Sequence, residues 1–264
     1  MLIDAHVHIF PKVDGYGPKG HTHGAGYGRI DAGDGIAQDV LPAINENTSH
    51  TLQMLLHEMR QGRVDKAVLI LCPCYGDWSE YVLQACRDYP EQFTASAFFD
   101  PWSPAARQYY SEKLEGSLWK NIKIEFSEAG GLYGVYPGVQ LDAPELRWLW
   151  EAMEAGEKTV SFDLGRPGDG SYQTDQIASI AKRHPGLKIV LCHMGQPSRA
   201  AERNPELWSA WLEQLRLGTL PNVWFDLSAL PYHVQKEEEY PFPSTKRYFD
   251  LSLIHISEPT RLQL

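Results

Sequence analysis

The chain has 264 residues, a formal net charge of −10 at pH 7 and a pI near 5.5. An acidic surface repels nucleic acid and anionic membranes, so the composition indicates a small-molecule partner. The length suits one α/β barrel or two smaller domains. No basic and apolar leader precedes Ile3, and no run of about 18 apolar residues predicts a membrane span, so we expect a cytoplasmic protein. The sequence is compatible with a homo-oligomer as well as with a monomer.

The four cysteines, Cys72, Cys74, Cys86 and Cys192, do not have the spacing of a disulfide framework. A chain of this length does not need disulfides to hold its core, so we expect reduced thiols, as in the cytosol. The segment Cys72-Pro73-Cys74 differs from the Cys-x-x-Cys spacing of redox and zinc-knuckle sites. Packing at a strand end is therefore the predicted role of this pair.

The first ten residues predict a strand with two different faces, because side chains alternate along a strand with a period of two. The apolar face carries Ile3, Ala5, Val7 and Ile9. The polar face carries Asp4, His6 and His8. Two histidines two residues apart on a strand project in parallel, so both rings can reach one metal ion at about 2.0–2.1 Å. The alternative is that His6 and His8 are hydrogen-bonded interior residues that bind no metal.

A long glycine-rich loop is expected from Pro11 to about Ile36. A loop of this length in a compact domain is usually functional or disordered, and this one is a candidate cover for a site. His21 and His23 repeat the His-x-His spacing within it. A glycine-rich loop does not fix two rings as a strand does, so we interpret this pair as exposed rather than metal-binding.

From Ser49 onwards the sequence alternates between helical and strand patterns. The amphipathic segments predicted as helices are 49–62, 81–87, 105–114, 144–155, 174–183 and 205–217. The apolar runs predicted as strands are 64–71, 93–99, 121–126, 159–164, 187–193 and 222–227. Continuous apolar strands between amphipathic helices are typical of a parallel sheet that is covered by helices. With the opening strand, the pattern predicts seven parallel strands.

Seven evenly spaced repeats favour a TIM-type (β/α)8 barrel, which has eight strands over about 250 residues, over an open doubly wound sheet. Polar residues at the carboxyl ends of several strands favour the same fold, because the active sites of such barrels are built there. These residues are His6, His8, Cys72, Asp100, Glu125, Asp163, His193 and Ser228.

The opening Ile-Asp-Ala-His-Val-His and the segment 187–195, Leu-Lys-Ile-Val-Leu-Cys-His-Met-Gly, resemble the amidohydrolase superfamily, specifically its amidohydrolase-2-like branch. The resemblance covers Met1 to about Asp250. It implies that His6 and His8 bind a divalent metal, usually zinc or manganese. It also implies that His193 acts in catalysis, whereas the structural alternative for His193 is a core residue at the strand end.

The fifth strand departs from the family pattern. Where the family commonly has Ile-His-Thr-Gly, this chain has Phe-Asp-Leu-Gly at 162–165, so Asp163 takes the place of a metal-binding histidine. A carboxylate oxygen can also bind zinc, at about 2.0–2.2 Å, so Asp163 is a predicted ligand as well as a predicted catalytic group. Some relatives hydrolyse lactones on the same barrel without a metal, and the substitution keeps that mechanism open. An ion pair between Asp163 and Arg166 is the structural alternative.

Glu125 and Lys123 share a strand face, because they lie two residues apart. An unpaired charge inside a barrel is costly. The two residues therefore either pair with each other, or Glu125 has a catalytic role in which it contacts substrate or metal.

Two arginines and one aspartate complete the set of candidate residues. Arg166 and Arg199 follow the fifth and sixth strands, and their guanidinium groups are candidates for binding a substrate carboxylate. Asp226 is expected on the face opposite Ser228, where it would anchor a helix rather than take part in chemistry.

The end of the chain differs from the rest. Residues 251–264 resemble the translation of a transposon-end sequencing adapter, so we expect a barrel over 1–250 and a non-native tail over 251–264. In the family, an eighth strand ends in a Gly-Ser-Asp or Gly-Thr-Asp triplet whose aspartate binds metal or activates water. No such triplet follows Ser244, so the sequence predicts a barrel that is truncated before strand eight.

These features predict a metal-dependent hydrolase of the amidohydrolase-2 type that cleaves C–O or C–N bonds in a small carboxylated or cyclic substrate. The metal would polarise a carbonyl or lower the pKa of bound water to about 7. His193 would stabilise the oxyanion or move a proton. The alternatives are a non-oxidative decarboxylase, a metal-independent lactonase and a non-catalytic fragment. A TatD-like nuclease barrel also begins with His-x-His, but the acidic motif of such nucleases is absent from this sequence.

Overall fold

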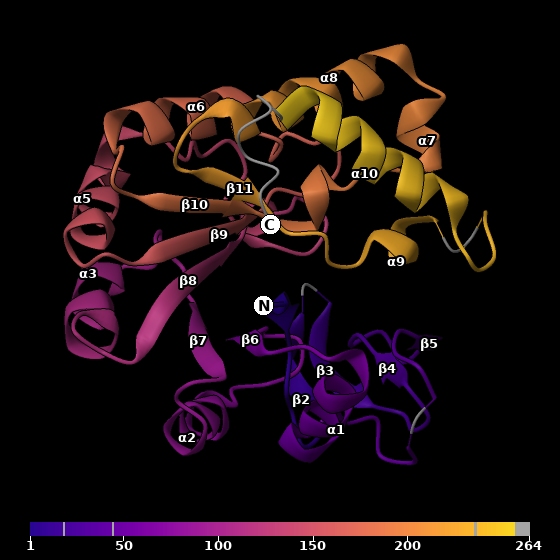
Figure 1. Ribbon diagram of the computed structural model, residues 1–264. Helices are drawn as coiled ribbons and strands as arrows, with labels where there is room; N and C mark the ends of the chain where they lie inside the picture. The colour runs from indigo at the N-terminus through magenta and orange to yellow at the C-terminus, as the bar shows by residue number, and fades with distance from the viewer. Residues whose placement is uncertain (18, 44, 235–236, 257–264) are drawn as a thin grey trace. The chain divides into compact units, whose positions relative to one another are not determined.

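The structure is a computed structural model that describes residues 1–17, 19–43, 45–234 and 237–256. The chain divides into two compact units, Met1–Lys123 and Ile124–Leu264. From residue 52 onwards, helical segments and strands alternate along the chain (Figure 1). The strand β8 (Trp119–Glu125) crosses the boundary and therefore contributes residues to both.

Unit 1 contains four parallel strands in the order β1-β6-β7-β8. The first three have the bounds Ile3–Val7, Lys66–Ile70 and Phe93–Phe98. The helical segments between them are α1 (Leu52–Gly62), α2 (Ser79–Asp88), α3 (Ala106–Tyr109) and the π-helical turn η1 (Tyr110–Leu114). The register places Asp4 opposite Ala67, so β1 runs beside β6 with His6 near the carboxyl end of the strand.

The residues of α1 explain where this helix begins, which face it buries and where it ends. The Thr51 side chain accepts a hydrogen bond from the backbone N–H of Met54, which satisfies one of the donors at the start of the helix. The buried residues of α1 lie on one face and are Leu55, Leu56 and Met59. Arg63 has a left-handed backbone with φ of 53°, which ends the helix before β6.

The segment predicted as a long loop instead forms a four-stranded antiparallel sheet in unit 1. Its strands are β2 (Asp14–Gly17), β3 (Gly20–Gly24), β4 (Arg29–Asp31) and β5 (Ala37–Asp39). The loop prediction was wrong because the strands are short and the glycines between them resemble loop composition. Phe10, Val13 and Ile30 form a small buried cluster that gives this sheet its own core. The side chains of His21 and His23 are about half exposed on β3, as predicted.

Unit 2 begins with the end of β8, where the Phe126 N–H donates to the carbonyl oxygen of Asp163 at 2.8 Å. The parallel strands that follow are β9 (Thr159–Asp163), β10 (Lys188–Leu191) and β11 (Val223–Phe225). The longer helices are α5 (Arg147–Ala155), α6 (Thr174–Arg183), α8 (Pro205–Leu215) and α10 (Pro243–Ile256). The shorter segments are α4 (Leu132–Val135), η2 (Pro144–Leu146), η3 (Cys192–Gly195), α7 (Arg199–Glu202), η4 (Arg216–Thr219) and α9 (Leu230–Val234).

The helix α10 continues past the boundary that the sequence predicts between a barrel and a tail. Leu251 packs against a buried cluster that contains Met194, Trp211 and Tyr248. The remainder of the predicted tail, residues 257–264, lies outside the described residues.

The order of parallel strands and intervening helices is that of a TIM-type (β/α)8 barrel, with seven barrel strands among the described residues. This confirms the predicted fold class, and every predicted strand is present, mostly with ends that are shorter than the apolar run in the sequence. Within the described residues, no helix has both the length and the apolar composition needed to cross a bilayer.

Candidate active site

His6 and His8 lie side by side at the carboxyl end of β1 in unit 1. Their ring centroids are 5.1 Å apart and the rings are nearly perpendicular, with an interplanar angle of 74°. Val7 and Ile9 between and after them are buried, so the alternation predicted for the opening strand is present at its carboxyl end. The two imidazoles therefore share one face, as the sequence predicts.

The tautomer of His8 is set by its backbone partner. The Nδ1 atom of His8 lies 2.7 Å from the carbonyl oxygen of Ile70 at the end of β6. A carbonyl only accepts hydrogen bonds, so Nδ1 carries a proton, and in the neutral imidazole the lone pair is on Nε2. This arrangement is typical of metal-binding histidines, whose second nitrogen is held by a carbonyl or a carboxylate.

Lys123 on β8 is buried with its ammonium nitrogen 3.4 Å from Nε2 of His6. An ammonium group only donates hydrogen bonds, so Nε2 of His6 acts as the acceptor in this contact. A neutral imidazole nitrogen is the donor atom that zinc or manganese requires, and a metal bound by Nε2 of His6 would replace its contact with Lys123. The residues of this half of the site fit a divalent metal.

A pocket of about 240 Å³ opens beside these histidines in unit 1. Its polar lining includes Asp4, His6, His8, His50 and Glu58. The sequence reasoning missed His50 and Glu58, which lie in an irregular segment and in α1 and have no recognisable motif.

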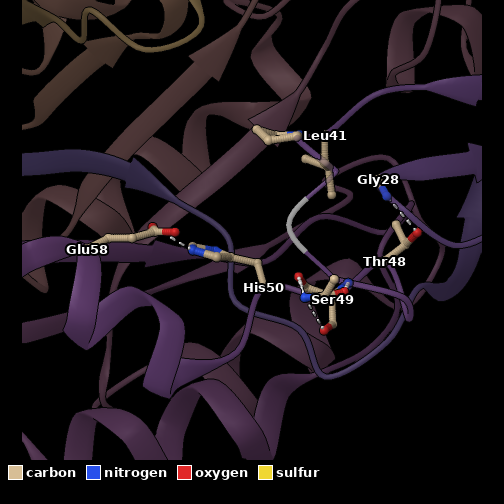
Figure 2. A pocket seen from close by; sticks show the side chains of 8 residues that line it. Gly28, Leu41, Thr48, Ser49, His50 and Glu58 are labelled. Carbon is tan, nitrogen blue, oxygen red and sulfur yellow. Dashed lines mark hydrogen bonds and ion pairs between the residues drawn. The ribbon is translucent and has the colours of Figure 1, made fainter.

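His50 links this pocket to the backbone of β1. Its Nδ1 atom lies 2.7 Å from the carbonyl oxygen of His8, and its Nε2 atom lies 3.0 Å from a carboxylate oxygen of Glu58. Figure 2 shows this pair at the edge of a second pocket, of about 200 Å³, which Gly28 and Thr48 also line. His50 and Glu58 line both pockets, as does Leu41.

In unit 2, the side chain of Asp163 at the end of β9 is buried, and its polar partners include Gly165, Gln196 and His193. Its Oδ1 atom accepts hydrogen bonds from the Gly165 N–H at 3.1 Å and from the Gln196 side-chain amide at 2.7 Å. Its Oδ2 atom lies 3.1 Å from Nε2 of His193. The predicted alternative, an ion pair with Arg166, was wrong, because the Arg166 guanidinium lies 3.6 Å from Asp169.

His193 is the centre of a hydrogen-bonded chain in unit 2. Its Nδ1 atom lies 2.7 Å from the hydroxyl oxygen of Ser228, and the Ser228 hydroxyl donates to a carboxylate oxygen of Asp226. A hydroxyl has one proton, which here goes to Asp226, so Nδ1 of His193 must be the donor toward Ser228. The expectation that Asp226 and Ser228 lie on opposite faces was therefore wrong, since residues two apart project to the same side.

The backbone at His193 has an unusual conformation. His193, Met194, Gly195 and Gln196 have φ values of 57°, 50°, 69° and 53°, so four consecutive residues are left-handed. Such a run costs about 1–2 kcal/mol for each residue other than glycine and is rarely seen beyond a single residue.

Hydrogen bonds from other segments hold this left-handed turn. The N–H groups of His193 and Met194 donate to the side chain and to the carbonyl of Asp226, at 2.7 and 2.8 Å. Trp211 and Tyr172 donate to the carbonyls of Met194 and Gly195, both at 2.9 Å. Burial raises the pKa of Tyr172 well above its ordinary value, so its hydroxyl stays a donor. The turn places the His193 ring toward Asp163 and Ser228.

His233 on α9 lies next to His193, with ring centroids 5.8 Å apart. Burial, followed by the charge of His193, lowers the pKa of His233 to about 4, while Asp163 opposes this shift. Among the described residues, Nε2 of His233 has no hydrogen-bond partner. The sequence contains no motif that would have indicated this residue.

The remaining predicted residues are in unit 2 and already have polar partners. Glu125 accepts a hydrogen bond from the Ser127 hydroxyl at 2.8 Å. Arg199 forms ion pairs with Glu202 at 2.7 Å and with Glu238 at 3.6 Å. These contacts reduce the positive charge that Arg199 offers to a ligand.

Comparisons with known proteins identify the family. An amidohydrolase family model, Amidohydro_2, matches residues 3–257. A probable 2-pyrone-4,6-dicarboxylic acid hydrolase from Acinetobacter baumannii, solved with citric acid bound, is 14% identical, with a TM-score of 0.61 over 95% of this chain and 78% of that chain. A zinc-bound amidohydrolase from Burkholderia multivorans is 18% identical, with a TM-score of 0.57 over 97% of this chain and 80% of that chain.

A TIM-barrel protein of Bordetella bronchiseptica is 15% identical, with a TM-score of 0.50 over 78% of this chain and 79% of that chain. No match was found among curated protein sequences. At such identities the solved structures support the fold. Because the family model covers nearly the whole sequence, the chain belongs to the amidohydrolase-2 family.

Proposed function

We propose that this protein is a metal-dependent hydrolase that acts on a small carboxylated or cyclic substrate. The observation that carries the proposal is the contact of His8 Nδ1 with the carbonyl oxygen of Ile70, which makes Nε2 the nitrogen that would bind a metal. His6 lies beside it with Nε2 as an acceptor. The zinc found in the Burkholderia relative supports zinc as the ion, with manganese as the other candidate.

A bound metal would supply a Lewis acid that polarises the scissile carbonyl and lowers the pKa of a bound water. In this proposal His6 and His8 of unit 1 are metal ligands, and the role of Asp163 in unit 2 as a further ligand stays a prediction from the sequence. His193 moves the proton through Nε2, because its Nδ1 is committed to Ser228. Asp226 acts as a positioning residue, since it holds both Ser228 and the backbone of His193.

The two arginines of unit 2 that are candidates for substrate binding, Arg166 and Arg199, suit a substrate with a carboxylate group. The Arg166 side chain is exposed, and its contact with Asp169 at 3.6 Å is longer than a normal hydrogen bond. Its guanidinium can therefore turn toward a carboxylate ligand more readily than that of Arg199, which is held by two acidic residues. The dicarboxylic acid named for the Acinetobacter relative, and the citric acid bound to it, support this substrate class. Glu125 is the proposed polar contact to the remainder of the substrate.

The metal proposal is tested by elemental analysis of the purified protein and two matched double variants. We expect about one zinc or manganese ion per chain, as for a mononuclear catalytic site. His6→Ala/His8→Ala should lose this ion. His21→Ala/His23→Ala removes the same number of imidazoles with the same spacing from β3 and should keep it. The proposal fails if the wild type binds no metal, or if both double variants retain it equally.

A metal-independent lactonase is the second candidate, and the contact between Asp163 and His193 favours it. A carboxylate and an imidazole in contact can exchange a proton, which is general acid–base chemistry that needs no metal. The two candidates differ in their response to a chelator when a cyclic ester with carboxylate substituents is the substrate. Hydrolysis that survives complete metal removal and disappears in His193→Asn supports the lactonase. Hydrolysis that stops on chelation and returns with zinc supports the metal enzyme.

A further inference from the structure

Two cysteine side chains meet in a tight turn that follows β6. The N–H of Tyr75 donates to the carbonyl oxygen of Cys72 at 3.0 Å, so residues 72–75 form a β-turn with Pro73 at its second position. Proline fixes the backbone there in the conformation that the turn requires. This brings the Sγ atoms of Cys72 and Cys74 to 2.8 Å from each other.

The backbone of this turn is held by the neighbouring sheet. The N–H groups of Asp14 and Tyr16 on β2 donate to the carbonyls of Tyr75 and Pro73, at 3.0 and 2.9 Å. The Thr22 hydroxyl donates to the carbonyl of Cys74. With its backbone fixed on one side, the turn has little freedom to separate the two thiols.

The two cysteines differ in their access to solvent. Cys72 lines a pocket of about 420 Å³, whose walls also include Phe98 and Tyr109, whereas Cys74 does not line it. Both are partly exposed, while Cys86 and Cys192 are buried. Burial also raises the pKa of the Cys86 thiol to about 11, which keeps this residue protonated and unreactive.

We propose that Cys72 and Cys74 are a modification site, which a small hydroperoxide converts to an intramolecular disulfide. In the first step the Cys72 thiolate attacks a peroxide oxygen, the O–O bond breaks, and Cys72 becomes a sulfenic acid as the leaving oxygen takes a proton. In the second step the Cys74 thiolate attacks the Cys72 sulfur, the S–O bond breaks, and water leaves with a second proton. The two thiols lose two electrons in total, which reduce one hydrogen peroxide to two waters.

The disulfide would act on the pocket that contains His6 and His8. Tyr75, the last residue of the turn, stacks on Phe10 with a centroid separation of 4.3 Å and an interplanar angle of 9°. The Tyr75 ring also lies 5.2 Å from the ring of His8. A covalent bond across the turn therefore restrains a residue that packs directly against a proposed metal ligand. This inference does not depend on which reaction the site catalyses.

Peptide mapping of the wild-type protein tests the inference without any substitution. Trypsin releases residues 67–87 as one peptide, which contains Cys72, Cys74 and Cys86. After exposure to hydrogen peroxide, denaturation and alkylation, we expect this peptide to carry one alkyl group, on Cys86, and to have lost two hydrogen atoms elsewhere. Treatment with dithiothreitol before alkylation should restore three alkyl groups. Alkylation of Cys72 and Cys74 despite peroxide treatment, or equal oxidation of Cys86, would overturn the proposal.

Single variants test the order of the two steps. Cys74→Ser should accumulate sulfenic acid on Cys72, which dimedone traps, at a level about tenfold above that in Cys72→Ser. Cys86→Ser is the matched control and should form the disulfide as the wild type does. Equal dimedone labelling of Cys72→Ser and Cys74→Ser would contradict the assignment of Cys72 as the attacking thiol. Intermolecular disulfides in place of the internal one would contradict the proposal as a whole.

Discussion

The Nε2 atom of His193 lies 3.1 Å from Oδ2 of Asp163. The substitution Asp163→Asn keeps the shape of the side chain and removes its charge. General acid and base groups contribute about 10²–10⁴ in rate, so we expect kcat to fall by about that factor. The measurement is kcat and KM for a cyclic carboxylated ester, with circular dichroism as the control for folding. A variant that folds normally and retains full activity would exclude Asp163 from the reaction.

Asp226, which directly follows β11, should contribute strongly to the stability of the folded protein. Its buried carboxylate accepts hydrogen bonds from the backbone of His193 and from Ser228. Asp226→Ala leaves these donors unsatisfied and should lower the free energy of unfolding by about 3 kcal/mol. Asp226→Asn retains an accepting oxygen and should cost clearly less. Urea denaturation measures both, and equal losses in the two variants would contradict this account.

Gly195 is required by both its conformation and its surroundings. A Cβ atom there would lie 2.3 Å from the side-chain oxygen of Gln214, and the residue has φ of 69°. We expect Gly195→Ala to lower the free energy of unfolding by about 2–4 kcal/mol. Gly138→Ala is the matched control, because Gly138 is also left-handed, at 86°, but has open space around its Cα.

The free energy of unfolding of Gly138→Ala should fall by only about 1 kcal/mol, the cost of a left-handed backbone at alanine. Adding Gln214→Ala to Gly195→Ala should restore part of the lost stability, because it removes the atom that the new methyl group meets. Thermal or urea denaturation compares the variants. If the two glycine variants lose the same stability, the steric part of the argument is wrong.

His233 should make the protein sensitive to mild acid. Its pKa is 6.5 in the unfolded chain and about 4 in the folded protein. As pH falls below 6.5 the unfolded state takes up a proton that the folded state does not, so stability present at neutral pH is lost toward pH 4. At pH 5 the loss should be about 2 kcal/mol. His233→Gln should lose less stability than the wild type between pH 7 and pH 5 in urea denaturation. Parallel pH profiles would show that His233 does not titrate in this way.

The barrel strands could be predicted because each is a continuous apolar run between amphipathic segments, as in residues 64–71 for β6. The sheet β2–β5 pairs neighbouring segments, but it could not be predicted, because part of what holds it lies far away in the sequence. Asp14 and Tyr16, for example, bond to the turn at 73–75. Short strands with glycine between them carry no periodicity that distinguishes them from a loop.

The sequence indicated candidate site residues where a histidine falls at the carboxyl end of a predicted strand, as for His8 and His193. The tautomer of His8 could not be predicted from the sequence, because it depends on the carbonyl of Ile70, which belongs to another strand. The left-handed turn at 193–196 was also hidden, since only Gly195 among its residues favours that backbone. Asp226 was assigned to the wrong face, although regular alternation places it with Ser228.

The contact between β2 and the turn after β6 has a consequence for local unfolding. A Cβ atom on Gly15 would lie 2.1 Å from the carbonyl oxygen of Pro73, and one on Gly76 would lie 2.6 Å from that of Asp14. The two main chains are thus in direct contact, with hydrogen bonds between them, so neither can open without the other. Exchange of the amide protons of Asp14 and Tyr16 with solvent should therefore give one common free energy of opening. These protons would report how often the support beside His8 opens, from residues that contribute no side chain to the proposed metal site.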